Sequence, residues 1–245
     1  PFSVSGDLLR ESAKLARTLG VRLHTHVAET RDEEQFTLEK FGLRPVAYMQ
    51  SLGWTGPDVW YAHGIHFNDD ELRILAETGT GVAHCPASNM KLSSGVCRVP
   101  ELLRLDIPVG LAVDGAASND GSSLLEEMRV CYLLHRLLAS APAPTGYDVL
   151  KLATRGSARL LGRDDIGCLA AGKAADLFLI DLNRLSLVGA QFDPMSMLGT
   201  VGFKGDVDYT IVNGVPVVQH GELTTIDERE TAYEANRVVA RYLGR

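Results

Sequence analysis

VRLHTHVAET, residues 21–30, decides the fold, because it has the pattern of a β-strand that ends in a histidine and a carboxylate. β-Branched and other apolar residues alternate with polar ones through most of the stretch, and a period of two predicts a strand. His24 and His26 therefore share one face, and Glu29 lies at the carboxyl end, where α/β enzymes place their chemistry. A His-x-x-Glu pair there predicts a metal ligand and a general acid, although a strand histidine is more often a hydrogen-bonded core or surface residue.

Composition limits the classes of partner. The 245 residues are 45% hydrophobic and 22% charged, which is typical of a globular protein with a sizeable core. The net charge is −7 and no basic cluster stands out, so neither nucleic acid nor an anionic membrane is an expected partner. No apolar run approaches the ~20 residues of a membrane helix, and no signal-peptide pattern is present, which predicts a cytoplasmic protein.

Further strands are expected to alternate with helices. The predicted strands are 59–63, 82–85 and 109–113, and the predicted helices of this part are 5–19, 31–41, 45–53, 69–79 and 99–105. Thr30 with Glu33 and Asn68 with Glu71 have the spacing of capping boxes. The sequence PASN, which follows the strand at 82–85, is rich in turn-forming residues and predicts a turn.

Chemistry-bearing residues recur at the ends of these strands. His26, His63, His84 and Asp114 are separated by 37, 21 and 30 residues, each close to the length of one βα unit. The spacing predicts parallel strands whose carboxyl ends meet, and hence one shared site. Asp114 before Gly115 also fits a simple turn, but Gly110 and Ala112 on the same predicted face favour a carboxylate standing above a crowded interior.

The pattern changes after Asp114. Helices are expected from Ser123 to about Ala139 and over 147–161. From Lys173 the sequence favours strands, and Asn213-Gly214 is a strong two-residue hairpin signal. A last helix is predicted over 228–243.

Five ordered segments resemble the amidohydrolase superfamily, in its branch of purine and aminotriazine deaminases and chlorohydrolases. They are HVAET (26–30), AHGIHF (62–67), HCPASNMKLSSG (84–95), VDGAASND (113–120) and GCLAAGKAADL (167–177). SNMKLSSG followed by VDGAASNDGSS is most similar to the 8-oxoguanine deaminases within that branch.

The resemblance implies an α/β fold, a TIM-type (β/α)8 barrel with a small β-sandwich domain. The strands seen here match the fifth to eighth of the barrel, so four earlier units and half of the sandwich are expected upstream of Pro1. The expected domains are the carboxyl-terminal part of the barrel at 1–165, a sandwich segment at 166–225 and a carboxyl-terminal helix at 226–245. His24-Thr25-His26 is not the family's His-x-His metal pair, because VAET follows it directly.

The resemblance also implies roles for individual residues. His26 and Asp114 would bind one divalent metal, zinc by preference with Fe2+ or Mn2+ as alternatives. Glu29 would protonate a ring nitrogen, and Asp114 would accept a proton from water. His63 would orient that water or, as in binuclear relatives, bind a second metal. Glu29, Ser88 and Asn89 are expected to contact the substrate.

The other histidines are expected to have no direct role. His66 and His84 are predicted to pack in the loops around the site, and His135 and His220 to lie in solvent. The four cysteines lack C-x-x-C spacing, which favours free thiols, and Cys85 at a strand end is a candidate to line the site.

The implied function is hydrolytic deamination of a purine-type ring, with 8-oxoguanine converted to urate and ammonia. One alternative is a related aminohydrolase or chlorohydrolase of a triazine or pterin ring. Another is a non-catalytic barrel fragment that lacks the first metal-ligand pair. The expected partners are a small heterocyclic substrate and further copies of the chain in a homo-oligomer.

Overall fold

The computed structural model describes residues 1–138 and 141–245, which form two compact units. Unit 1 comprises Pro1–Gly167 together with Phe192–Phe203. Unit 2 comprises Cys168–Gln191 together with Lys204–Arg245.

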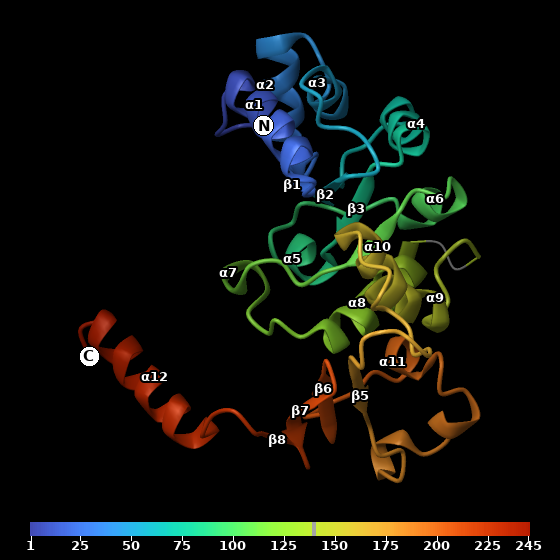
Figure 1. Ribbon diagram of the computed structural model, residues 1–245, viewed down its shortest axis with the longest axis vertical. Helices are drawn as coiled ribbons and strands as arrows, with labels where there is room; N and C mark the ends of the chain where they lie inside the picture. The colour runs from blue at the N-terminus through green and yellow to red at the C-terminus, as the bar shows by residue number, and fades with distance from the viewer. Residues whose placement is uncertain (139–140) are drawn as a thin grey trace. The chain divides into compact units, whose positions relative to one another are not determined.

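A four-stranded parallel sheet organises unit 1. Its strands are β1 (Leu23–Val27), β2 (Val59–His63), β3 (Gly81–His84) and β4 (Val109–Leu111), and they lie side by side in chain order. Figure 1 labels β1, β2 and β3 of this sheet. The predicted α/β fold with parallel strands is confirmed. Because all four strands run in one direction, their carboxyl ends share one edge of the sheet.

Helices join and cover these strands. They are α1 (Gly6–Leu19), α2 (Arg31–Phe41), α3 (Pro45–Ser51), α4 (Asp69–Thr78), α5 (Pro86–Lys91), α6 (Val99–Arg104), α7 (Ala116–Asn119), α8 (Leu124–Leu138), α9 (Gly146–Lys151), α10 (Ser157–Leu161) and α11 (Met197–Thr200). Ser5 caps α1 through Leu8 N–H, and Gly20 ends it with a left-handed φ of 65°. The predicted end of α8 near Ala139 lies outside the described residues.

Strand β1 keeps the predicted alternation. Leu23 and Val27 are buried, whereas His24 and His26 are exposed on the other face. β3 is buried at every position, as is usual for a strand inside a parallel sheet.

Two local predictions needed correction. PASN is not an open turn but the first part of helix α5, because Pro86 supplies the fixed φ that suits a first helical position. The predicted helix over 147–161 contains a π-helical turn at Leu152–Gly156. A Cβ on Gly156 would lie 2.1 Å from the carbonyl oxygen of Val109, so glycine lets this turn approach strand β4.

Small residues in the sheet leave room for α10. A Cβ on Gly110 would lie 2.8 Å from Leu160 Cδ1 and 3.0 Å from Ser157 Oγ. The predicted alternation does not extend from Gly110 to Asp114, because β4 ends at Leu111 and the chain then turns.

An antiparallel sheet organises unit 2. Its strands are β5 (Leu177–Leu179), β6 (Tyr209–Val212), β7 (Val215–Gln219) and β8 (Glu222–Leu223), with short 3-10 turns at Leu185–Leu187 and Ala190–Phe192. The predicted hairpin at Asn213-Gly214 is confirmed. Both residues have positive φ, 48° and 80°, as a tight β6–β7 turn requires.

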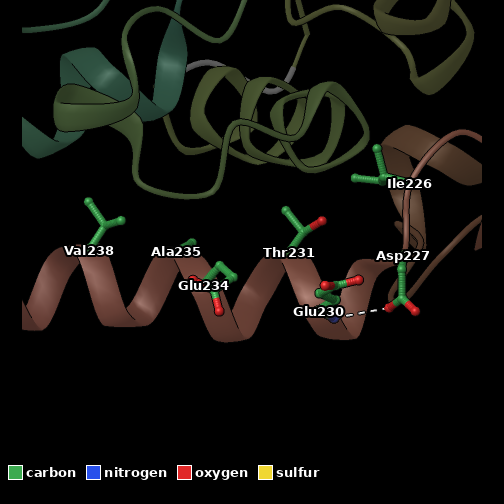
Figure 2. Close-up of a pocket in the computed structure, with 7 residues that line it drawn as sticks. All are labelled: Ile226, Asp227, Glu230, Thr231, Glu234, Ala235 and Val238. Atoms are coloured by element: carbon green, nitrogen blue, oxygen red, sulfur yellow. Dashed lines mark hydrogen bonds between the residues drawn. The ribbon is translucent and has the colours of Figure 1, made fainter.

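Helix α12 (Glu228–Tyr242) ends the chain close to the predicted bounds. A pocket of about 540 Å³ lies along it, lined by Ile226, Asp227, Glu230, Thr231, Glu234, Ala235 and Val238 (Figure 2). Its polar groups are carboxylates and one hydroxyl, without histidine, so it differs in chemistry from the strand ends of unit 1. Among the described residues, no helix has both the length and the apolar character that crossing a membrane requires.

Candidate metal centre

The ends of strands β1, β2 and β4 bring two histidines and an aspartate together. One ligand atom from each of His26, His63 and Asp114 lies within 4.8 Å of the other two. The ring centroids of the two histidines are 5.1 Å apart. Three of the four residues predicted at the strand ends therefore share one place.

Left-handed turns make this convergence possible. Ala28, His63 and Asp114 have φ values of 56°, 73° and 66°, a region that residues other than glycine seldom occupy. Each such residue costs on the order of 1–3 kcal/mol, and such strain clusters at functional sites. The turns break the alternation of the strands, which frees His63 and Asp114 to face His26.

Two hydroxyl groups hold the carboxylate of Asp114. Ser88 Oγ, at 2.5 Å, and Ser118 Oγ, at 2.8 Å, both donate to the same oxygen, Oδ2. Burial alone would raise the pKa of Asp114, but these hydrogen bonds and one from the Gly115 backbone outweigh it and lower the pKa. Asp114 is therefore an ionised carboxylate at neutral pH.

His63 is enclosed and faces a second carboxylate. Its side chain is 1% exposed, Nε2 lies 3.6 Å from Glu29 Oε2, and Nδ1 lies 3.0 Å from Asn89 Nδ2. Burial lowers the pKa of His63, although the negative charges of Glu29 and Asp114 oppose that shift. A neutral imidazole results.

Hydrogen bonds fix the position of Glu29, which lies in the turn that follows strand β1. Ser94 Oγ donates to Glu29 Oε1 at 3.3 Å. The backbone N–H groups of Ala28 and Glu29 donate to the two carboxylate oxygens of Glu33, at 2.8 and 3.2 Å. Thr30 accepts from Glu33 N–H as predicted, but the Glu33 side chain does not complete the capping box, because it extends further back along the turn.

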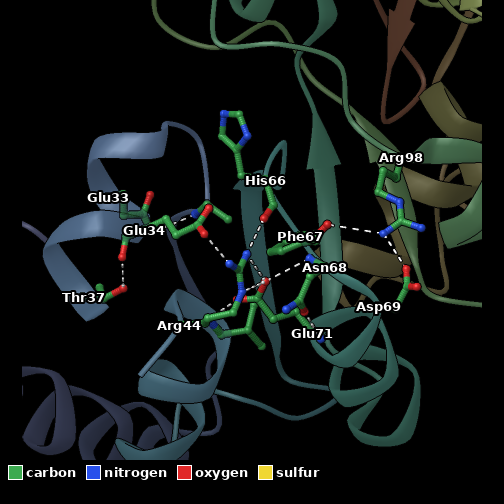
Figure 3. A network of polar contacts seen from close by, with 12 residues as sticks. Glu33, Glu34, Thr37, Arg44, His66, Phe67, Asn68, Asp69, Glu71 and Arg98 are labelled. Carbon is green, nitrogen blue, oxygen red and sulfur yellow. Dashed lines mark hydrogen bonds and ion pairs between the residues drawn. The ribbon is translucent and has the colours of Figure 1, made fainter. Parts of the chain in front are cut away.

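An ion-pair network supports the turn after β2 (Figure 3). Arg44 donates to Glu71 Oε2 from Nε and Nη2, at 3.0 and 2.8 Å, and also pairs with Glu34. Its Nη2 donates to the carbonyl oxygen of His66 at 2.8 Å. Glu71 accepts from Asn68 N–H as well, which completes the predicted capping box of α4.

Ser88 and Asn89 lie in α5, and both are fully buried. Their side chains reach Asp114 and His63 respectively. Contact of Ser88 and Asn89 with a substrate stays a prediction.

His84 and His135 depart from the arrangement expected from the sequence. His84 is fully buried away from His26, and its Nε2 lies 3.3 Å from His135 Nε2 on α8. The prediction that His135 is solvated was wrong, since it is 2% exposed and fills a helical core position. Cys85 is also buried, and burial raises the pKa of its thiol to about 12.

The sequence reasoning missed several residues that shape the centre. Ser118 follows Asp114 by one helical turn, and Ser94 follows α5, but neither has a pattern that separates it from ordinary loop serines. The sequence predicts Glu33 only as part of a helix cap. The spacing of the sequence cannot show where these side chains reach, because that depends on the turns.

The donor set fits a divalent metal. Imidazole nitrogen together with carboxylate oxygen is the ligand combination of zinc sites and of iron or manganese hydrolases. His26 is exposed on one side of the cluster, while His63 and Asp114 are enclosed by hydrogen-bonded neighbours. The residues that could hold an ion are therefore His26, His63 and Asp114.

Comparison with known proteins identifies relatives over most of the chain. The chain is 54% identical over 198 residues to an 8-oxoguanine deaminase of Pseudomonas aeruginosa, covering 81% of this chain and 44% of that protein. It is 46% identical over 236 residues to a hydroxydechloroatrazine ethylaminohydrolase of Pseudomonas sp. strain ADP, covering 95% and 49%. The chain therefore spans about half the length of these relatives.

Solved structures show the same fold. An adenosine deaminase from Xanthomonas campestris with bound zinc matches 98% of this chain and 55% of its own, with a TM-score of 0.94 and 30% identity. An atrazine chlorohydrolase from Arthrobacter aurescens complexed with zinc matches 96% and 52%, with a TM-score of 0.91 and 30% identity. A profile of the amidohydrolase family matches residues 1–217. The chain therefore belongs to the amidohydrolase family.

Proposed function

We propose that the protein is a metal-dependent hydrolytic deaminase of a purine-type ring, and that it converts 8-oxoguanine to urate and ammonia. One observation carries the proposal: His26, His63 and Asp114 converge from separate strand ends, with Glu29 beside His63. The similarity to a Pseudomonas aeruginosa 8-oxoguanine deaminase supports the choice of ring.

His26 and Asp114 are the proposed ligands of one divalent metal, zinc by preference. When bound, such an ion lowers the pKa of water to about 7 and so supplies a nucleophile at neutral pH. The zinc bound in the two similar solved structures, the adenosine deaminase and the atrazine chlorohydrolase, supports this choice of ion.

The side chains then divide the proton transfers. Asp114, kept ionised by Ser88 and Ser118, accepts a proton from the attacking water. Glu29 donates a proton to the ring nitrogen next to the carbon under attack. His63 donates a hydrogen bond to the water oxygen and holds it in line with that carbon.

The overall reaction balances with one water. The water oxygen forms a bond to the ring carbon, the bond from that carbon to the amino nitrogen breaks, and the proton held by Asp114 goes to the leaving nitrogen. As the carbonyl forms, the hydroxyl proton on the ring carbon goes to Glu29 and replaces the proton that Glu29 gave to the ring nitrogen. The products are a ring carbonyl and ammonia, and both carboxylates return to their starting state.

We further propose that the parallel sheet belongs to a (β/α)8 barrel at 1–165, and that the antiparallel sheet at 166–225 belongs to a small β-sandwich, followed by a carboxyl-terminal helix at 226–245. The fold similarity to amidohydrolase structures supports this assignment. The assembly is proposed to be a homo-oligomer.

A second candidate function is hydrolysis of a triazine or pterin ring, with loss of amine or chloride. It is favoured by the similarity to the ethylaminohydrolase, the chlorohydrolase and an isoxanthopterin deaminase. The same side chains would serve. An amine takes the proton from Asp114 as it leaves, whereas chloride leaves as an anion and the proton on Asp114 is released to solvent.

Release of ammonia or chloride by the native protein tests the proposal across a panel of 8-oxoguanine, guanine, adenosine, isoxanthopterin, aminotriazines and chlorotriazines. Turnover of 8-oxoguanine above all others is the expected result. Preference for a triazine or pterin would establish the second candidate. Absence of turnover on the whole panel by metal-loaded protein would overturn both and leave the non-catalytic fragment.

A further inference from the structure

The ring of His63 has an unusual partner. A neutral imidazole carries one N–H and one lone pair, and the group bonded to one nitrogen decides what the other nitrogen offers. The Asn89 amide occupies Nδ1 at 3.0 Å, which leaves Nε2 for the reaction centre and Glu29.

The direction of this hydrogen bond sets the chemistry of His63. Asn89 presents its amide nitrogen to Nδ1, and an amide nitrogen can only donate. Nδ1 must then be the unprotonated nitrogen that accepts with its lone pair, and Nε2 carries the proton. A histidine that binds a metal through Nε2 has the opposite arrangement, because its Nδ1–H donates to a carbonyl or carboxylate.

We infer that Asn89 is a positioning residue that fixes the proton of His63 on Nε2, so that His63 acts as a hydrogen-bond donor at the reaction centre and not as a metal ligand. The inference rests on the proposed function and deepens it. It also chooses between the two roles of His63 that the sequence left open.

Helix α5 holds the Asn89 side chain in place. Asn89 N–H donates to the carbonyl oxygen of Cys85 at 3.0 Å, and its own carbonyl accepts from Ser94 N–H at 2.9 Å. The first turn of α5 is anchored at Ala87 N–H, which donates at 3.1 Å to the buried carboxylate of Glu127. A fully buried side chain on a backbone fixed at both sides has little freedom to turn.

A contribution to the stability of the fold does not explain why a side-chain amide occupies the buried position 89. Asn89 Oδ1 is buried without a hydrogen-bond partner among the described residues. An unpaired buried acceptor costs on the order of 1–3 kcal/mol, whereas an apolar side chain of the same shape avoids that cost. The hydrogen bond from its nitrogen to His63 Nδ1 is a contact that asparagine makes and an apolar side chain cannot.

The direct test is the tautomer of His63 in the native, zinc-loaded protein. Nitrogen NMR of protein labelled with 15N-histidine distinguishes a protonated from an unprotonated ring nitrogen, and a His63→Gln variant assigns the signals. The expected spectrum shows Nε2 protonated and Nδ1 unprotonated. A proton on Nδ1 would overturn the inference whether or not 8-oxoguanine is a substrate.

An Asn89→Leu variant tests the consequence, with Asn183→Leu at an exposed position of unit 2 as the matched control. Without the donor, both tautomers of His63 become populated and kcat falls by about 100-fold, the size of effect seen when one preorganised donor is lost. The midpoint of urea unfolding stays near that of the control. An unchanged kcat, or a loss of activity explained by a lower unfolding midpoint, would contradict the positioning role.

Discussion

At the scale of one residue, the position of Glu29 leads to a testable role as the proton donor. Its Oε1 accepts from Ser94 and its Oε2 lies 3.6 Å from His63 Nε2, so its carboxyl group faces the cluster that holds the proposed metal. A Glu29→Gln side chain keeps the shape but cannot deliver a proton. We expect kcat to fall by roughly 10²–10⁴-fold, the contribution of a general acid.

Ammonia release from 8-oxoguanine measures this loss, and thermal unfolding checks that the variant is folded. Glu39→Gln, an exposed change on α2, is the control and should keep full activity. Activity of Glu29→Gln within a few-fold of the control would exclude Glu29 as the proton donor.

The period of two and the spacing of the strands predicted that His26, His63 and Asp114 meet at one edge of the sheet. They could not predict which residues support them. Ser118 bonds to Asp114, and Asn89 bonds to His63, because Asp114 and His63 adopt positive φ. Apart from the glycine that follows Asp114, no sequence pattern predicts that conformation.

At the scale of elements, buried carboxylates fasten the strand-end turns. Glu33 on α2 accepts from the turn after β1, Glu71 on α4 from the turn after β2, and Glu127 on α8 from Ala87 after β3. Each is 1–3% exposed, and each accepts at least one hydrogen bond from a backbone N–H group of the turn. Helices therefore hold the loops that carry the site.

Glu33→Gln tests this fastening. A glutamine can accept from only one of the Ala28 and Glu29 N–H groups, because its other end is itself a donor. One buried N–H is left unpaired, so the free energy of unfolding should fall by about 1–3 kcal/mol. Urea unfolding measures the loss, and a midpoint equal to that of Glu39→Gln would contradict it.

The Arg44 network offers a second test at this scale. Arg44→Met leaves the Glu71 carboxylate, whose side chain is 2% exposed, without its cation. Breaking a buried pair costs about 3–5 kcal/mol. The double variant Arg44→Met with Glu71→Gln should lose less than the sum of the single losses, because no uncompensated charge stays buried. Strictly additive losses in urea unfolding would mean that Arg44 and Glu71 are not coupled.

The element boundaries were largely predictable, because glycine stops and side-chain caps act locally. Ser5 with Gly20 and Asn68 with Gly79 set the limits of α1 and α4. The errors arose where distant contacts override local preference. The Glu33 side chain accepts hydrogen bonds from the turn beside Glu29 instead of completing the predicted capping box. Helix α5 forms where a turn was expected.

At the scale of the whole molecule, one property of the parallel sheet matters most. Neighbouring strands that run in one direction place their ends on one edge, so residues far apart in the sequence meet there. Strand spacing was enough to predict this meeting. It was not enough to exclude His84, which turns into the core toward His135 on α8.

The metal content of the native protein tests the central claim most directly. Elemental mass spectrometry after exhaustive buffer exchange is expected to give about one zinc per polypeptide, the stoichiometry of a mononuclear catalytic site. Asp114→Asn should lose most of that metal. A native protein free of divalent metal, or one whose metal content is unchanged by Asp114→Asn, would contradict the assignment of His26 and Asp114 as the ligands of a metal-dependent deaminase.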